Sequence, residues 1–372
     1  MYSINFSKKK YDILILDDGQ VDFKLQTYNF YIINFKSINF FVFIISLLKF
    51  LKSNKDKLSF KEIYKQNLYR HFKPKIIISH HLNNRSFEAK YLCPEIITMT
   101  YQFGFINEHA RFLKDRPKKY CETDYFFVFH EIDKKIFEKS FSSNFIISGS
   151  ARNNSFSLEK IKNKKYFITY ISEFKKKPKI RNNNIYLYEK NVYEYQTKIE
   201  VFVLNILKDI CQKNGKKLRI ALRSNRQDKK HKLKKSEEIS YYKSILGYTP
   251  EIDGNENSYQ VANNSKLSIC LGSNLGIELI SRDLMVFFIN IFSNYNKAQT
   301  IPYFTINDSL LVCSKENSEI IRKKISNLLN LDIQDFKNEI SKYFRKILFD
   351  PNNKIITNKI DEILKNENIH NC

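Results

Sequence analysis

Short, near-continuous apolar runs alternate with longer amphipathic stretches along most of this 372-residue chain. Runs of this kind are typical of strands in a parallel sheet, because helices cover both faces of such a sheet. The alternation predicts an α/β protein. In the first half we expect strands at residues 11–16, 75–79, 96–100, 125–129 and 145–148, and helices at residues 40–53, 60–72, 86–91 and 131–140.

The same alternation restarts after a polar stretch at residues 151–165. Strands are predicted there at 166–171, 218–222, 267–271 and 285–289, and helices at 193–214, 259–264, 277–282, 318–330, 335–348 and 359–365. We therefore predict two Rossmann-like domains facing a cleft, residues 1–155 and residues 156–372, the second including the C-terminal helices. Ligands of such sheets bind beyond the carboxyl ends of the strands, so the residues that follow each strand are candidate site residues.

The composition supports buried cores and favours an anionic partner. Hydrophobic residues make up 42% of the chain and aromatic residues 15%, which excludes disorder over most of its length. An excess of 63 Lys and Arg over 39 Asp and Glu gives a net charge of +24. Such a charge favours nucleic acid, acidic lipid or a phosphorylated small molecule, although a lysine-rich surface without a partner is the simpler interpretation.

The six cysteines are scattered without a CxxC pair, and no spacing suits a metal site. Scattered single cysteines are typical of reduced thiols, and the first ten residues lack the pattern of a signal peptide. We therefore expect a cytoplasmic protein with no bound metal.

The most apolar run, residues 40–48, ends at Lys49 and is shorter than the roughly 18 residues that span a bilayer. A buried core helix is the favoured interpretation. The alternative is peripheral contact with the inner face of the cell membrane, assisted by Lys49, Lys52, Lys55 and Lys57.

The most informative motif follows the strand predicted at 267–271 and reads Gly272-Ser273-Asn274-Leu275-Gly276-Ile277-Glu278. Glycines let a ligand approach the backbone, and N–H groups at a helix N-terminus favour phosphate. Glu278 lies in the first helical turn, where it can accept hydrogen bonds from ribose hydroxyls. The motif predicts a nucleotide site; an ordinary strand–turn–helix corner capped by Ser273 or Asn274 is the alternative. It matches neither G-x-S-x-G nor G-x-G-x-x-G.

Gly-Ser-Asn-Leu-Gly-x-Glu in this position resembles the donor site of GT-B glycosyltransferases, in particular those of bacterial lipopolysaccharide and capsule biosynthesis. The resemblance extends to residues 73–78, to the turn Gln102-Phe103-Gly104 and to residues 145–150. Asn274 and Phe103 depart from the usual Thr and from the usual Asn or His. The resemblance implies that the C-terminal domain holds a nucleotide-sugar donor, with Gln102 and Gly104 also in the donor-binding set. It also implies that the N-terminal domain holds the acceptor, and that C-terminal helices can cross back to it.

The basic segment at residues 223–235 follows the strand predicted at 218–222. Arg223 is therefore expected at the mouth of the cleft, where a guanidinium can bind a diphosphate in bidentate fashion. For the lysines beyond it, a solvated run of charges is the simpler interpretation. Arg, Lys and N–H groups can neutralise a leaving diphosphate, so no metal ion or other cofactor is required.

Sugar transfer needs a base for the acceptor hydroxyl, and His or a carboxylate serves near neutral pH. His81 closes the strand predicted at 75–79 together with His80, and Glu108 with His109 lies beyond the 102–104 turn. We select His109, Glu108 and His81 as candidate catalytic residues, with the pair at 17–18 as a further candidate. A polar loop residue or a packed histidine is the alternative for each.

The sequence thus predicts a metal-independent glycosyltransferase that passes a sugar from a nucleotide-activated donor to a surface polysaccharide or lipopolysaccharide, with a glycan or lipid-linked glycan as acceptor. A glycerophosphate-type transferase and a non-catalytic GT-B-like binding protein are the alternatives. No nucleic-acid partner is expected, because no RRM, KH or helix-turn-helix signature is present.

Overall fold

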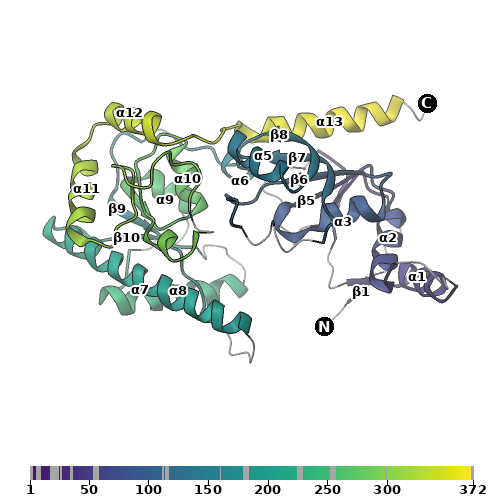
Figure 1. The fold of residues 1–372 in the computed structure, drawn as a ribbon, viewed down its shortest axis with the longest axis horizontal. Helices are drawn as coiled ribbons and strands as arrows, with labels where there is room; N and C mark the ends of the chain where they lie inside the picture. Colours follow the sequence, from purple (N-terminus) through teal and green to yellow (C-terminus); the bar gives the residue numbers. More distant parts are fainter. Residues whose placement is uncertain are drawn as a thin grey trace. The chain divides into compact units, whose positions relative to one another are not determined.

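The computed structural model describes residues 3–5, 10–16, 25, 27–33, 37–52, 58–110, 113, 117–159, 161–178, 184–223, 229–251, 257–297 and 300–369. The chain divides into two compact units (Figure 1). Unit 1 comprises Met1–Phe156 and Leu348–Cys372, and unit 2 comprises Ser157–Ile347.

Unit 1 contains most of its elements before residue 156 and two after residue 348. In chain order they are β1 (Ser3–Asn5), β2 (Ile13–Ile15), β3 (Phe30–Ile32), β4 (Ser37–Asn39), α1 (Phe40–Lys52), α2 (Phe60–Phe72), β5 (Ile76–His80), η1 (His81–Asn83), α3 (Arg85–Leu92), β6 (Ile97–Tyr101), β7 (Glu122–Val128), α5 (Glu131–Glu138), β8 (Ser142–Ile147), α6 (Ala151–Asn154), η4 (Pro351–Asn353) and α13 (Lys354–Ile369).

The described strands of unit 1 form a six-stranded parallel sheet in the order β3-β2-β5-β6-β7-β8, and β1 pairs with β4 in a separate parallel ribbon. Alternate strand residues point to opposite faces of the sheet. One face of β2, which carries Ile13 and Ile15, packs in a core with Ile356, Ile360 and Ile363 of α13.

The other face of this sheet is covered by helices from the first half of the chain. Leu14 of β2 and Ile77 of β5 share a core with Leu68 and Phe72 of α2, and α3 contributes to the same core. Helices therefore cover both faces, as the near-continuous apolar strands predict.

The C-terminal segment differs from the sequence prediction. The predicted second domain ran from 156 to 372, but the chain from Leu348 onward belongs to unit 1. The physical reason is that the isoleucines of α13 cover a sheet face that would otherwise be left to water. The crossing back of C-terminal helices that the family resemblance implies applies to α13, since α12 (Ile333–Tyr343) lies in unit 2.

Unit 2 has a second parallel sheet. Its elements are β9 (Tyr166–Ile171), α7 (Asn184–Lys213), β10 (Arg219–Ala221), α8 (Lys229–Leu246), α9 (Ser258–Asn263), β11 (Ser265–Cys270), α10 (Asn274–Ile280), β12 (Val286–Ile289), η2 (Ile291–Asn294), β13 (Val312–Cys313), α11 (Ser318–Asn330) and α12. The described strands pair in the order β10-β9-β11-β12-β13, all parallel. Two parallel sheets confirm the predicted α/β class.

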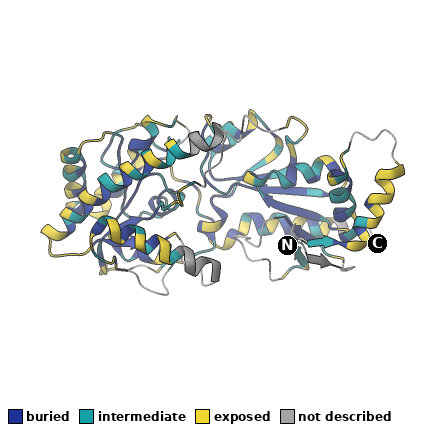
Figure 2. Cartoon of the chain, turned by 90° about the horizontal axis from the view of Figure 1, so that it is seen from below, coloured by how far each residue is buried: buried dark blue, intermediate teal, exposed yellow. Residues whose placement is uncertain are grey.

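Helix α1 contradicts the favoured interpretation of the apolar run. Only Val42 and Ser46 of this helix are buried, and most of the helix is drawn in the colour of exposed residues at the right-hand edge of Figure 2. The run is therefore a surface helix and not a core helix. None of the helices that the structure describes is both long and apolar enough to cross a membrane.

Candidate functional site

The carboxyl ends of β9 and β11 are adjacent at the centre of the unit 2 sheet. The chain leaves β9 through α7 to reach β10 on one side, whereas it leaves β11 to reach β12 on the opposite side. This reversal is the topological switch point, where open α/β sheets bind their ligands. The residues that follow β9, β10 and β11 are therefore candidate ligand contacts.

Glu173 and Gly272 join the two strand ends at this point. The backbone N–H of Gly272 donates a hydrogen bond of 2.6 Å to Oε1 of Glu173. Burial raises the pKa of the Glu173 carboxyl, while the Gly272 bond and the nearby Lys175 and Arg223 lower it. A carboxyl group with a raised pKa at a ligand-binding edge is suited to hydrogen bonding with hydroxyls and to proton transfer.

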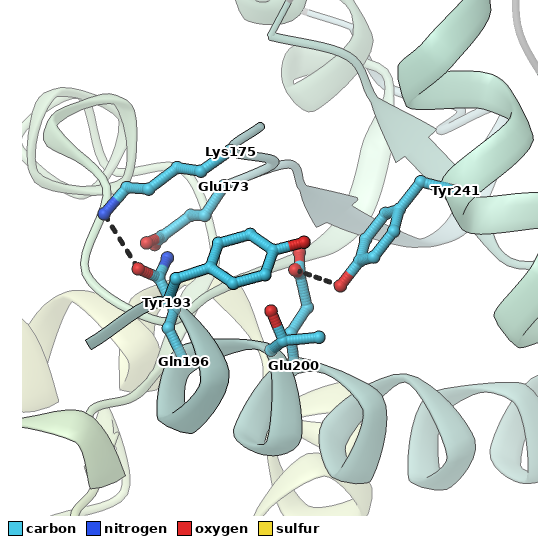
Figure 3. A pocket seen from close by; sticks show the side chains of 7 residues that line it. Glu173, Lys175, Tyr193, Gln196, Glu200 and Tyr241 are labelled. Carbon is cyan, nitrogen blue, oxygen red and sulfur yellow. Dashed lines mark hydrogen bonds between the residues drawn. The ribbon is translucent and has the colours of Figure 1, made fainter. Parts of the chain in front are cut away.

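A small pocket opens beside Glu173 (Figure 3). It contains about 200 Å³ of empty space, open solvent at its mouth included. Nζ of Lys175 donates a hydrogen bond of 2.8 Å to Oε1 of Gln196, and burial lowers the pKa of this ammonium. The other lining residues come from α7 and α8: Tyr193, Thr197, Glu200 and Tyr241.

Glu200 forms the floor of the site and is only 3% exposed. Its Oε1 accepts hydrogen bonds from Tyr170 (2.9 Å) and Tyr242 (2.8 Å), and its Oε2 accepts one from Tyr241 (2.8 Å). Burial raises the pKa of Glu200, although the three hydroxyls lower it. The carboxylate thus joins β9, α7 and α8 into one polar core below the pocket.

Glu238 of α8 forms hydrogen bonds with residues that follow both β9 and β10. Its Oε1 accepts a hydrogen bond of 2.8 Å from the backbone N–H of Arg223, and it accepts another from the hydroxyl of Ser172. Arg223 itself is exposed, and its guanidinium contributes electrostatically at Glu173 and Lys175. Two cations therefore act on one carboxyl group at the switch point. The sequence analysis selected Arg223 as a diphosphate contact and did not select Lys175.

The motif at residues 272–278 folds as a capped corner. Ser273 is the N-cap of α10, and its hydroxyl accepts a hydrogen bond from the N–H of Leu275. The N–H of Gly276 bonds the carbonyl of Ser273, and that of Gly272 bonds Glu173. Asn274 is the first residue of the helix. The sequence analysis expected these N–H groups to face a ligand. In the structure those of Gly272, Leu275 and Gly276 are hydrogen-bonded within unit 2.

Glu278 lies inside unit 2 and is 3% exposed. Its Oε2 accepts a hydrogen bond of 2.5 Å from the hydroxyl of Tyr259, and its charge acts on Arg282. The carboxylate joins α10 to α9, and it is not among the residues that line the pocket. Its burial and its bond to Tyr259 differ from the open contact with ribose hydroxyls that the sequence predicted.

The predicted turn residues of unit 1 are also structural. Gln102 is 2% exposed; its Nε2 donates to the carbonyl of Gly104 (3.0 Å) and to Oδ1 of Asp133 (2.8 Å). Its Oε1 accepts a hydrogen bond of 2.8 Å from the N–H of Phe129. The amide therefore holds the ends of β6 and β7 together. These residues belong to unit 1.

The two adjacent histidines behave differently. His81 is 1% exposed, its Nδ1 accepts a hydrogen bond of 3.0 Å from the N–H of Phe103, and its ring packs against Phe126 and Phe137. His80 ends β5 and is half-buried, with its ring 5.1 Å from that of Phe103. His81 is thus a packed histidine, the alternative raised for it from the sequence.

His109 and Glu108 lie on an exposed turn after β6. Nε2 of His109 is 3.7 Å from Oε1 of Glu108. The turn follows the carboxyl end of a parallel strand, as predicted, and the pair is accessible. The candidate pair at 17–18 and most of the basic segment beyond Arg223 lie outside the residues whose side chains are described.

Sequence reasoning missed Glu173, Lys175, Glu200 and Glu238. Glu173 directly follows Ser172 at the end of a predicted strand, so its position was a usable signal. Glu200 shares the helical spacing of buried Leu204 and Leu207, which marks it as a carboxylate on an apolar face. Glu238 lies on α8, a helix that the sequence analysis did not predict. In the part of the chain that the structure describes, no group of His, Cys, Asp or Glu is arranged to hold a metal ion.

A family model described as "putative O-antigen biosynthesis protein" matches residues 101–366 of this chain. No curated protein shows significant sequence similarity to it.

Many solved structures are similar in fold, and three of them cover nearly the whole chain. A "putative UDP-N-acetylglucosamine 2-epimerase" from Listeria monocytogenes has a TM-score of 0.55 at 9% identity, with 96% of this chain and 97% of that chain covered. S. aureus MnaA in complex with UDP has a TM-score of 0.51 at 10% identity, with 98% and 97% covered. A further UDP-N-acetylglucosamine 2-epimerase has a TM-score of 0.52 at 9% identity, with 98% and 96% covered. These likenesses establish a GT-B-like fold.

Proposed function

The chain belongs to the O-antigen biosynthesis protein family, and from this premise we propose that it is a glycosyltransferase of surface-glycan assembly. It passes a sugar from a nucleotide-activated donor to a growing polysaccharide or lipopolysaccharide on a lipid carrier, without a metal ion. The observation that carries the proposal is the cluster of Lys175, Arg223 and Glu173 at the topological switch point of unit 2.

The donor lies at the carboxyl edge of the unit 2 sheet in this proposal. Lys175 and Arg223 bind its diphosphate, because ammonium and guanidinium groups form strong charge-assisted hydrogen bonds with phosphate oxygens. Glu173 accepts hydrogen bonds from sugar or ribose hydroxyls. The pocket beside Glu173 has room for about one water molecule, so in this proposal the donor lies along its mouth and not inside it.

In the transfer step one bond forms, one bond breaks and one proton is transferred. A base removes the proton of the acceptor hydroxyl as its oxygen bonds to the anomeric carbon of the sugar, and the bond from that carbon to the diphosphate breaks. The two cations stabilise the charge that develops on the departing nucleoside diphosphate. The proposed base is His109, oriented by Glu108, because the pair is accessible whereas His81 is enclosed.

A calorimetric titration of the full chain with UDP, GDP, CDP, CMP and dTDP and their sugars tests the donor site. UDP comes first, because S. aureus MnaA of similar fold was solved with it. Lys175→Ala and Arg223→Ala should each weaken nucleotide binding by about ten- to a hundredfold. A loss of this size corresponds to the free energy of one hydrogen bond between charged groups. Lys177→Ala is the matched control, since Lys177 is an exposed lysine of the same loop.

An assay of nucleoside diphosphate release tests the sugar transfer. Release should require a lipid-linked glycan extract, and His109→Ala should reduce it by about a hundredfold or more while donor affinity stays unchanged. His80→Ala is the control, because His80 is a histidine that is not proposed as the base, and its release rate should stay close to that of the wild type. Full affinity for every nucleotide in both cation variants would refute the donor site.

Chromatography of the products of the same reactions separates the alternatives, because epimerisation releases no nucleotide and transfer of glycerol phosphate from CDP-glycerol releases CMP. Two of the proteins of similar fold are described as a putative and a further UDP-N-acetylglucosamine 2-epimerase, and epimerisation needs no acceptor. Conversion of a nucleotide sugar to its epimer without acceptor would replace the transferase proposal. Turnover of CDP-glycerol alone among the donors would indicate a glycerophosphate-type transferase, and binding without turnover would indicate a non-catalytic protein.

A further inference from the structure

Helix α1 exposes an apolar surface. Of the 14 large hydrophobic side chains that are exposed in the described structure, eight lie on this one helix, each between 37% and 68% exposed. They are Phe40, Phe41, Ile44, Ile45, Leu47, Leu48, Phe50 and Leu51. Single exposed apolar residues are ordinary, but a continuous patch marks a site of interaction.

The packing of α1 leaves this patch outward. The helix contacts α2 through buried Val42 and Ser46, whose hydroxyl accepts a hydrogen bond of 3.0 Å from Nδ2 of Asn67. Phe43 also packs on this side, with its ring 5.6 Å from that of Phe60. A helix at the surface of a soluble core normally turns polar residues to water. Here the side facing away from α2 is the apolar one.

Cations accompany the apolar patch, and α1 contains no acidic residue. Lys49 and Lys52 lie in its last turn, and Lys61 is exposed at the start of α2. The sequence adds Lys55 and Lys57 directly after the helix, in residues outside the described structure. Apolar side chains beside lysines complement the acyl boundary and headgroups of an anionic bilayer.

We propose that α1 binds the surface of an anionic lipid bilayer. The helix lies in the plane of the interface with its apolar patch in the acyl boundary, and Lys49 and Lys52 contact phosphate headgroups. Its 13 residues are fewer than the roughly 20 needed to span, so it lies on the membrane. The proposal concerns a surface of unit 1 and does not depend on the reaction proposed for unit 2.

A single introduced tryptophan tests insertion directly, because the chain contains none. Leu48→Trp in the full chain should show a blue shift of its emission with vesicles of phosphatidylcholine and phosphatidylglycerol, and quenching by brominated lipid. Ile333→Trp is the matched control, since Ile333 is 53% exposed but stands outside any such patch. Its emission should stay unchanged.

Vesicle sedimentation separates the apolar and the charged contributions. The triple variant Ile45→Gln, Leu48→Gln and Leu51→Gln should reduce binding at least about tenfold on every vesicle. The variant Lys49→Gln and Lys52→Gln should lose on the order of tenfold on anionic vesicles and little on phosphatidylcholine alone. The control is Ile306→Gln with Ile333→Gln, and thermal unfolding checks that each variant is folded.

Two results would overturn the proposal. One is equal vesicle binding by the wild type and the triple variant. The other is an absence of vesicle binding together with dimerisation of the wild type, but not of the triple variant, in analytical ultracentrifugation. The second result would assign the patch to another copy of this chain.

Discussion

At the scale of single residues, surroundings decide how each carboxyl group behaves. Glu62 accepts hydrogen bonds from Nζ of Lys119 (2.6 Å) and from the hydroxyl of Tyr120 (2.8 Å), and the bond from Lys119 is the main reason that its pKa falls from 4.5 to about 2. Glu200 is also hydrogen-bonded, but burial raises its pKa. Ionised Glu62 therefore stabilises the folded state. Burial makes the ionised form of Glu200 less favourable.

We expect Glu62→Gln to lower the free energy of unfolding by about 1–2 kcal/mol at neutral pH, because Glu62 also completes the capping box of α2 with Ser59. A lowered pKa in the folded state means stability that is present above the unfolded pKa of 4.5 and lost as the pH falls toward 2. Urea unfolding at several pH values should therefore show the two proteins converging below pH 4.5.

The control for that series is Glu138→Gln, which removes an exposed carboxylate 3.9 Å from Lys134. Its effect should stay within about 0.5 kcal/mol. A constant difference between wild type and Glu62→Gln down to pH 2 would contradict the argument.

At the scale of elements, one glycine sets how closely α10 approaches the sheet. A Cβ at Gly276 would stand 2.5 Å from Sγ of Cys270 on β11 and 2.8 Å from Cζ of Phe288 on β12. A Cβ at Gly272 would meet nothing within 4 Å. The second glycine of the motif is thus required for helix–sheet packing, which is the alternative interpretation of the motif.

Gly276→Ala should therefore lower the free energy of unfolding by about 1–3 kcal/mol through overpacking. Gly272→Ala should change the free energy of unfolding by less than about 0.5 kcal/mol, because the backbone N–H of residue 272 can still donate its hydrogen bond to Glu173. Urea titrations of both variants give the comparison. Equal stabilities would show that α10 can move away from β11 at no cost.

At the scale of the whole molecule, the chain completes unit 1 only at its end. The N–H of Asp350 donates a hydrogen bond of 2.9 Å to Oδ1 of Asn154, and Nδ2 of Asn353 donates one of 2.9 Å to the carbonyl of Ala151. The returning segment is thereby held at α6, and α13 then covers one face of the sheet.

We expect a fragment of residues 1–156 to lack a cooperative unfolding transition, because that sheet face would be open to water. The same fragment joined to residues 348–372 by a short Gly/Ser linker should recover it, and residues 157–347 should fold alone. Circular dichroism with urea denaturation measures all three. The linked fragment also carries α1, so it controls for aggregation through the apolar patch. Cooperative unfolding of 1–156 alone would contradict this view.

The sequence by itself determined the local structure. The strand predicted at 166–171 and the helices predicted at 60–72 and 318–330 have the bounds of β9, α2 and α11, because a period of 2 or 3.6 is a property of neighbouring residues. Helix α8 was missed, since its first part is a run of lysines with little apolar pattern. The position of Arg223 after a strand was also predictable.

Tertiary structure alone decided which residues meet. Glu173 and Gly272 are far apart in the chain, and the strand order β9-β11 brings them together. Glu278 has the sequence position of a ligand contact, but the hydroxyl of Tyr259 engages it in the interior. The apolar run of α1 has the composition of a core helix, yet α2 covers only one side of it. Burial depends on contacts between distant segments, and no local pattern contains that information.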